Sequence, residues 1–182
     1  MITVTDFQRP MDARFFLLFI PVAYGTYLFH ELGHWSVGEV LGNRMVYSLN
    51  GVWPKDGQYV QAGHALYASL GGPVFTVLQA MLSLLIIEKF RALYAYPFAS
   101  FPTYSRFFTL LFGGFGKQDE AHISAILGIG NYTVAIIVLA ILLSIVIRSS
   151  YKLRIGLQSN GYILTVSIVC QLLVIGTYTF VL

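Results

Sequence analysis

Residues 15–41 read FFLLFIPVAYGTYLFHELGHWSVGEVL, a long apolar run in which two histidines, His30 and His34, stand near the end. A helix needs about 20 mainly apolar residues to cross the hydrocarbon core of a bilayer, and this run supplies them. Ionisable side chains are costly in such a segment and by default mark a functional site. The stretch therefore predicts a membrane helix that carries polar chemistry.

The spacing of the histidines predicts a metal site. His30 and His34 are four residues apart, which on a helix places both rings on one face, one turn above the other. Two imidazoles so placed can both bind one Zn²⁺ at about 2.0–2.1 Å. Glu31 lies about 100° round the helix from His30 and need not bind the metal, so it can act as general base toward the attacking water. Because H-E-x-x-H is rare by chance in a chain with four histidines, we expect His30 and His34 to be zinc ligands and Glu31 to be catalytic.

A catalytic zinc site needs a third protein ligand and an open coordination position. The polar cluster KQDEAH at residues 117–122 offers the candidates. Asp119 is the predicted third ligand, with Glu120 and His122 as alternatives, since residues 119 and 122 can share a helix face. A solvated interhelical loop is the other interpretation of this cluster. His64, just before the second apolar run, is interpreted as a satisfied histidine at the membrane surface.

The composition of the whole chain points to lipid as its solvent. Of the 182 residues, 57% are hydrophobic and 10% are charged, whereas soluble domains carry about 25% charged residues. A soluble core of this size cannot bury so much apolar surface. We expect a single membrane-embedded domain over residues 1–182, with a catalytic core at about 15–130 and additional helices at about 131–182. The fold class is an all-α integral membrane helical bundle of about five transmembrane helices, predicted at residues 15–41, 66–87, 93–115, 131–147 and 161–181.

The third predicted span and the first loop depart from this regular pattern. Residues 93–115 contain Pro97, Pro102 and Arg106, so this span is expected to be kinked or partly re-entrant. Residues 42–63 are polar, with turn signals at 50–51 and 56–57 and with alternating side chains from residue 45 to 49. They predict a small interfacial β-hairpin between the first and second spans, with an irregular loop as the alternative.

The charges and the cysteine content restrict the location and the partners. Lysines and arginines of the predicted loops lie mainly on the membrane side of the N-terminus, which favours a cytoplasmic N-terminus. That side has Arg9, Arg14, Lys89, Arg91, Arg148, Lys152 and Arg154, whereas the opposite side has Arg44, Lys55 and Lys117. The net charge of +3 is too small and too scattered to indicate nucleic-acid binding. Cys170 is the only cysteine, which excludes an internal disulfide and a cysteine-based metal site. We expect a multi-pass membrane protein, with a bacterial inner membrane as the default location.

With these residues in view, the chain resembles the site-2 protease family of intramembrane zinc metalloproteases. The resemblance covers residues 15–130 and is carried by HELGHW at 30–35, by HALYASLGGP at 64–73 and by Asp119. In that family a Leu-Asp-Gly motif on a later helix provides the third zinc ligand, which implies this role for Asp119. Thr76 stands where the family commonly has asparagine, and residues 112–116 replace the proline-rich lead-in to Leu-Asp-Gly.

The resemblance implies an intramembrane zinc metalloendopeptidase that takes part in regulated intramembrane proteolysis. Its expected partners are a transmembrane protein or peptide substrate and the lipid bilayer. The expected reaction is cleavage of a transmembrane or membrane-proximal segment by zinc-activated water, with Glu31 as general base. The alternative is a non-proteolytic metal-binding membrane protein for transport or assembly, which would keep the histidines without needing Glu31. A structural membrane protein with an accidental motif is a third interpretation.

Overall fold

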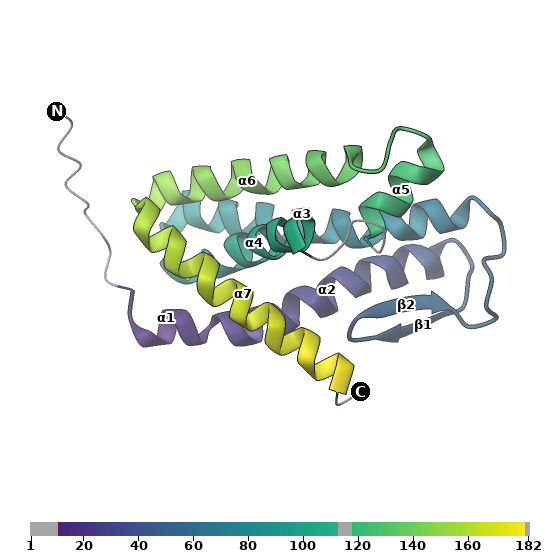
Figure 1. Ribbon diagram of the computed structural model, residues 1–182, viewed down its shortest axis with the longest axis horizontal. Helices are drawn as coiled ribbons and strands as arrows, with labels where there is room; N and C mark the ends of the chain where they lie inside the picture. Colours follow the sequence, from purple (N-terminus) through teal and green to yellow (C-terminus); the bar gives the residue numbers. More distant parts are fainter. Residues whose placement is uncertain (1–10, 113–117, 181–182) are drawn as a thin grey trace.

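The computed structural model describes residues 11–112 and 118–180 and shows a mostly helical bundle with a small hairpin at its side (Figure 1). Within these residues, four segments are long and apolar enough to cross a membrane, namely Ala13–Val40, His64–Phe90, Thr133–Leu153 and Leu157–Phe180. The first consists of a short α1 (Ala13–Leu17) continued by α2 (Phe19–Val40), and the others are α3, α6 and α7. The predicted helical membrane bundle is confirmed at this level.

The third predicted span is shorter than a full crossing. It forms a 3-10 helix, η1 (Leu93–Ala95), and the 16-residue helix α4 (Pro97–Phe112), while residues 113–115 of the prediction lie outside the described part. Sixteen helical residues extend over about 24 Å, less than the roughly 30 Å of a bilayer core. α4 lies in the middle of the bundle and packs against α3, α6 and α7 (Figure 1).

Helices α2 and α3 touch backbone to backbone at two glycines. A Cβ atom on Gly33 would meet the carbonyl oxygen of Gly71, and one on Gly71 would meet the carbonyl oxygen of Gly33. Small residues allow this approach in membrane helices, where close van der Waals packing drives association. The glycines of the Gly71-Gly72-Pro73 stretch thus let α3 lie directly against α2, the helix that carries His30 and His34. This contact also turns one face of α3 toward the histidines of α2.

The predicted hairpin is present. β1 (Met45–Ser48) pairs antiparallel with β2 (Gly51–Pro54), with Met45 opposite Pro54 and Ser48 opposite Gly51. The hairpin loop is therefore at residues 49–50, one residue earlier than the predicted turn, because Gly51 already pairs as the first residue of β2. The Tyr47 hydroxyl donates a hydrogen bond to the carbonyl of Leu28 at 2.6 Å, which holds the hairpin beside α2.

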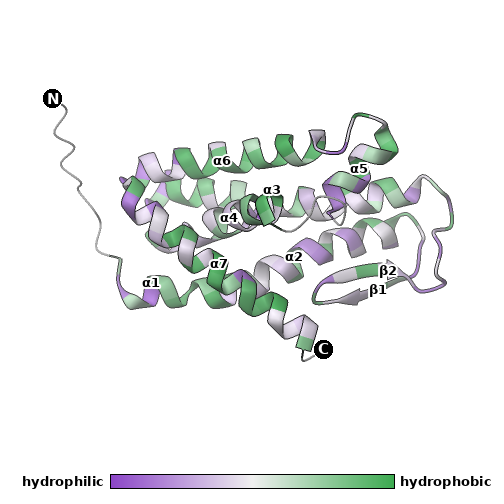
Figure 2. Ribbon diagram, in the orientation of Figure 1, coloured by the Kyte–Doolittle hydropathy of each residue, from purple (hydrophilic) through white to green (hydrophobic). Residues whose placement is uncertain are grey.

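The two ends of the bundle differ in packing. Large buried side chains fill the end away from the hairpin: Phe15, Phe19, Ile87, Tyr96, Phe101, Leu142, Leu153 and Ile163. At this same end Glu88 accepts charged hydrogen bonds from Arg148 at 2.6 Å and Lys152 at 2.9 Å, near the C-terminal ends of α3 and α6. Figure 2 shows the polar residues that border this end. The half of the bundle nearer the hairpin has glycines and polar side chains instead, and the candidate site lies there.

Candidate metal centre

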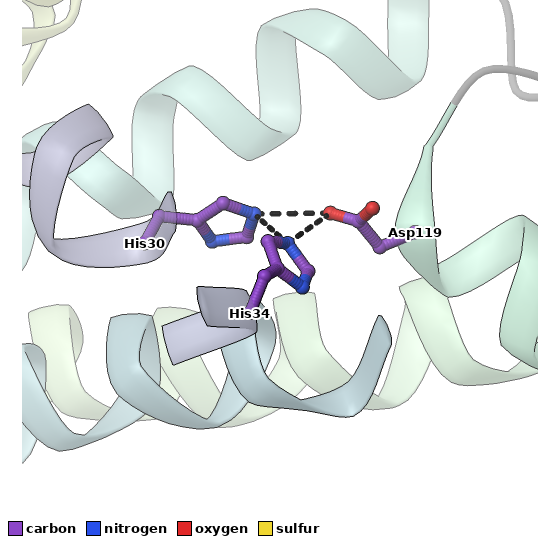
Figure 3. A group of neighbouring side chains, drawn as sticks. All are labelled: His30, His34 and Asp119. Carbon is purple, nitrogen blue, oxygen red and sulfur yellow. Dashed lines mark hydrogen bonds and ion pairs between the residues drawn. The ribbon is translucent and has the colours of Figure 1, made fainter. Parts of the chain in front are cut away.

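Three predicted residues come together between α2 and α5 (Asp119–Leu127). His30 and His34 project from α2, and Asp119 is the first residue of α5 (Figure 3). The Oδ2 atom of Asp119 lies 3.0 Å from Nε2 of His30 and 3.2 Å from Nε2 of His34, and the two Nε2 atoms are 3.1 Å apart. One ligand atom from each residue thus points to a common place.

The hydrogen bonds at the far side of each ring fix the histidine tautomers. Nδ1 of His34 lies 2.7 Å from the carbonyl oxygen of Ala68, which can only accept, and 3.4 Å from the backbone nitrogen of Gly72. The much shorter contact with Ala68 assigns the hydrogen to Nδ1. Nδ1 of His30 lies 2.8 Å from the hydroxyl of Thr76, whose own hydrogen goes to the carbonyl of Gly72 at 3.0 Å. The hydroxyl oxygen therefore accepts from His30. Both neutral rings then present the Nε2 lone pair toward Asp119, the arrangement that metal-binding histidines adopt.

A divalent cation would suit this arrangement. Two imidazole lone pairs and a carboxylate oxygen repel one another at about 3 Å. A proton on either ring would give a hydrogen bond to Asp119, but two protonated rings would repel each other across the 3.1 Å between their Nε2 atoms. A divalent ion relieves all three contacts. Ligands at about 2.05 Å in tetrahedral geometry are about 3.3 Å apart, close to the observed 3.0–3.2 Å. Two imidazoles and one carboxylate form a ligand set typical of catalytic zinc, so the residues fit the metal that the sequence predicts.

Gly72 forms the wall of the site on the α3 side. A Cβ atom at this position would collide with Nε2 of His34 and would lie 2.6 Å from Nε2 and from Cε1 of His30. The two rings therefore occupy the space that a side chain on α3 would fill. Only glycine leaves the ligand atoms where they are.

The ligands open onto a cavity of about 500 Å³. Glu31 lines it together with His30, His34 and Asp119, although only 7% of the Glu31 surface is exposed. Within residues 11–112 and 118–180, no hydrogen bond or ion pair holds the Glu31 carboxylate. Residues 50–52 at the tip of the hairpin line the same cavity, as do polar residues of α4 and the last turns of α7. The candidate metal ligands, the Glu31 carboxylate and the tip of the hairpin thus all border the same cavity.

The alternative third ligands lie elsewhere. The Glu120 side chain is only 1% exposed and pairs with Arg106 through its Oε2 atom at 3.2 Å. His122 is on the exposed side of α5. His64 accepts a hydrogen bond from the side chain of Asn43 at 3.2 Å and remains away from the site, as its interpretation as a satisfied histidine requires. Lys117 lies outside the described residues.

Three residues of the site were not predicted from the sequence. Arg106 of α4 lines the cavity beside His30, and a charged residue inside an apolar run is the signal that indicates it. Thr76 supports His30 from α3, at the position where asparagine is common in the family that the chain resembles. Tyr59, in the loop between β2 and α3, also lines the cavity, where burial and the charge of Asp119 raise the pKa of its phenol.

Comparison of the chain with protein-family models, curated proteins and solved structures gives no match.

Proposed function

We propose that this protein is an intramembrane zinc metalloendopeptidase that cleaves transmembrane or membrane-proximal peptide segments. The observation that carries the proposal is the convergence of His30, His34 and Asp119 beside Glu31, in a cavity within a bundle of apolar helices. The likeness of residues 30–35 and 64–73 to the site-2 protease family supports the same reaction.

A zinc ion bound at this site would act as a Lewis acid and bring the pKa of bound water toward neutrality. His30, His34 and Asp119 would hold it, with the rings oriented by Thr76 and by the carbonyl of Ala68. Glu31 takes a proton from the attacking water and gives it to the leaving amine as the C–N bond breaks. Its carboxylate suits this role because it lines the cavity and no hydrogen bond or ion pair in the described part of the chain occupies it.

The course of the chain supports a fifth crossing of the membrane. Glu88 joins the C-terminal ends of α3 and α6, so these two helices run in the same direction. The chain between them, residues 91–132, must therefore return from one end of the bundle to the other. α4 makes part of this passage through the middle of the bundle, although it is too short for a full span. Five crossings would place the two termini on opposite sides, with the basic end of the bundle in the cytoplasm.

The tip of the hairpin supports a peptide as substrate. A peptide bond inside a helix is shielded by its hydrogen bonds, so a transmembrane segment must unwind before water can reach its carbonyl carbon. Residues 50–52 border the cavity, and in the described part of the chain β1 and β2 form a sheet of two strands. An unwound segment can add to such a sheet through backbone hydrogen bonds and thereby enter the cavity in extended form.

Removal of the metal tests the proposal. The protein, purified in detergent with zinc, should cleave unfolded casein or synthetic single-span peptides, with products identified by mass spectrometry. Treatment with 1,10-phenanthroline should abolish cleavage, and added Zn²⁺ should restore it, because water activation requires the metal. A zinc-loaded protein that cleaves none of these substrates would favour the non-proteolytic metal-binding alternative. Cleavage that persists after complete zinc removal would contradict the proposed mechanism.

A further inference from the structure

Arg106 has an unusual position beside the candidate metal centre. Its Nη1 atom donates to Oε2 of Glu120 at 3.2 Å, and its Nη2 atom lies 3.3 Å from Nδ1 and 3.4 Å from Nε2 of His30. The Arg106 side chain is 18% exposed, and this residue lines the cavity. Among the described residues that line this cavity, Arg106 is the only lysine or arginine. A guanidinium group next to a cation site is costly, so its presence there calls for a reason.

The contacts from Nη2 of Arg106 to the His30 ring are long, at 3.3 and 3.4 Å, and neither ring nitrogen offers them a free lone pair. Nδ1 of His30 carries a hydrogen that goes to Thr76, and the lone pair of Nε2 points toward Asp119. The nearly equal distances to the two ring nitrogens also show that Nη2 is aimed at neither lone pair. Glu120 holds the other end of the guanidinium, so the group is fixed with N–H donors available beside the ligand atoms. An oxygen atom in the cavity could accept them.

We propose that Arg106 is a further catalytic residue, which binds the carbonyl oxygen of the scissile peptide bond. This inference rests on the proposed function. When water attacks the carbonyl carbon and its proton passes to Glu31, the C=O π electrons become a negative charge on the carbonyl oxygen. An N–H group of Arg106 stabilises this charge until the C–N bond breaks and Glu31 returns the proton to the amine. Donors fixed in advance at a developing oxyanion are among the largest contributions to catalysis.

A purely structural role is the competing explanation. The pair of Arg106 and Glu120 also joins α4 to α5, and Asp119 stands directly before Glu120. Loss of the pair could displace Asp119, and removal of Arg106 alone would leave a buried carboxylate without a partner. Four variants separate the roles: Arg106→Gln, Arg106→Lys, Glu120→Gln and the double variant Arg106→Gln/Glu120→Gln. Arg148→Gln is the matched control, because Arg148 forms an ion pair with Glu88 far from the cavity.

The measurements are zinc content, cleavage of a single-span peptide, and affinity for a phosphinic pseudopeptide, whose anionic phosphinate oxygens resemble the developing oxyanion. In the double variant we expect zinc to remain, kcat to fall about 100-fold and KM to change less than about threefold. Its affinity for the phosphinic probe should fall by about the same factor as kcat/KM. Glu120→Gln should lose less than about tenfold in kcat/KM and in probe affinity, since this variant keeps the guanidinium of Arg106. Arg106→Lys should recover part of the probe affinity, and Arg148→Gln should match the unaltered protein.

Equal losses in Glu120→Gln and in the double variant would overturn the inference, since the ion pair alone would then explain them. Retention of kcat and probe affinity in the double variant would overturn it as well. If the double variant does not fold, the same probe measurement on Arg106→Lys and Glu120→Gln decides. The inference predicts the larger loss in Arg106→Lys, which removes the guanidinium, whereas the structural role predicts it in Glu120→Gln, which breaks the ion pair. Failure of the proposed function looks different. The unaltered protein would then either not cleave the peptide at all or continue to cleave it after zinc removal.

Discussion

Replacing Glu31 with glutamine is expected to lower the rate of peptide cleavage by about 1,000-fold while the zinc content stays unchanged. General acid–base catalysis typically contributes about 10²–10⁴-fold, and an amide cannot take up the proton. Glutamine has nearly the shape of glutamate, and Glu31 is not among the three converging ligands. Single-turnover cleavage of a single-span peptide, together with zinc analysis of the same sample, measures both quantities.

Glu39→Gln is a suitable control for this experiment. Glu39 lies on the same helix, and its Oε1 atom accepts a hydrogen bond from the backbone N–H of Met45 at 2.8 Å, which the oxygen of glutamine can also accept. We expect its activity to equal that of the unaltered protein. Unchanged cleavage in Glu31→Gln would exclude Glu31 as the base and would favour a metal site with a non-proteolytic role.

Replacing Gly72 with alanine is expected to weaken zinc binding by at least about 100-fold. The added Cβ atom would occupy the place of His34 Nε2 and press on the His30 ring, so that both ligand atoms have to move. Displacing residues that merely orient metal ligands already costs about 10–100-fold in affinity. Competition with a chromogenic zinc chelator gives the affinity, and circular dichroism shows whether the helices persist.

Gly25→Ala tests whether any added methyl group in a membrane helix has this effect. Gly25 is on α2, the helix that carries both histidines, and a Cβ atom there meets nothing within 4 Å. This variant should bind zinc like the unaltered protein. Gly72→Ala with normal zinc affinity would show that the rings do not hold a metal in the positions described.

The sequence predicted the apolar helices and the histidine pair well because both depend on local spacing. A span follows from the length of an apolar run, and the common direction of His30 and His34 follows from one turn of helix. The hairpin followed from alternation and turn residues, although its loop came one residue earlier than predicted. Its exact pairing depends on which residues face each other, which composition does not determine.

The residues that come to His30 and His34 from other helices were harder to predict, because their positions depend on how separate helices pack together. Thr76 reaches His30 only because Gly33 and Gly71 let α2 and α3 touch, and the sequence shows no sign of that contact beyond the glycines themselves. In the sequence Arg106 indicates a broken span, whereas packing of α4 in the middle of the bundle brings it next to His30. Ligand chemistry and the family likeness favour Asp119 among three candidates in the sequence, and the fold brings it to His30 and His34, which stand 89 and 85 residues earlier in the chain.

The zinc content of the purified protein, compared between the unaltered chain and Asp119→Ala, tests the three-ligand site most directly. Elemental analysis should find about one zinc ion per unaltered chain, and Asp119→Ala should lose it during dialysis against a mild chelator, because two ligands hold zinc much less tightly than three. His122→Ala, three residues further along α5, should keep the metal, since its side chain is exposed. A chain that contains no zinc after growth and purification with the metal, or that retains it fully in Asp119→Ala, would contradict the account.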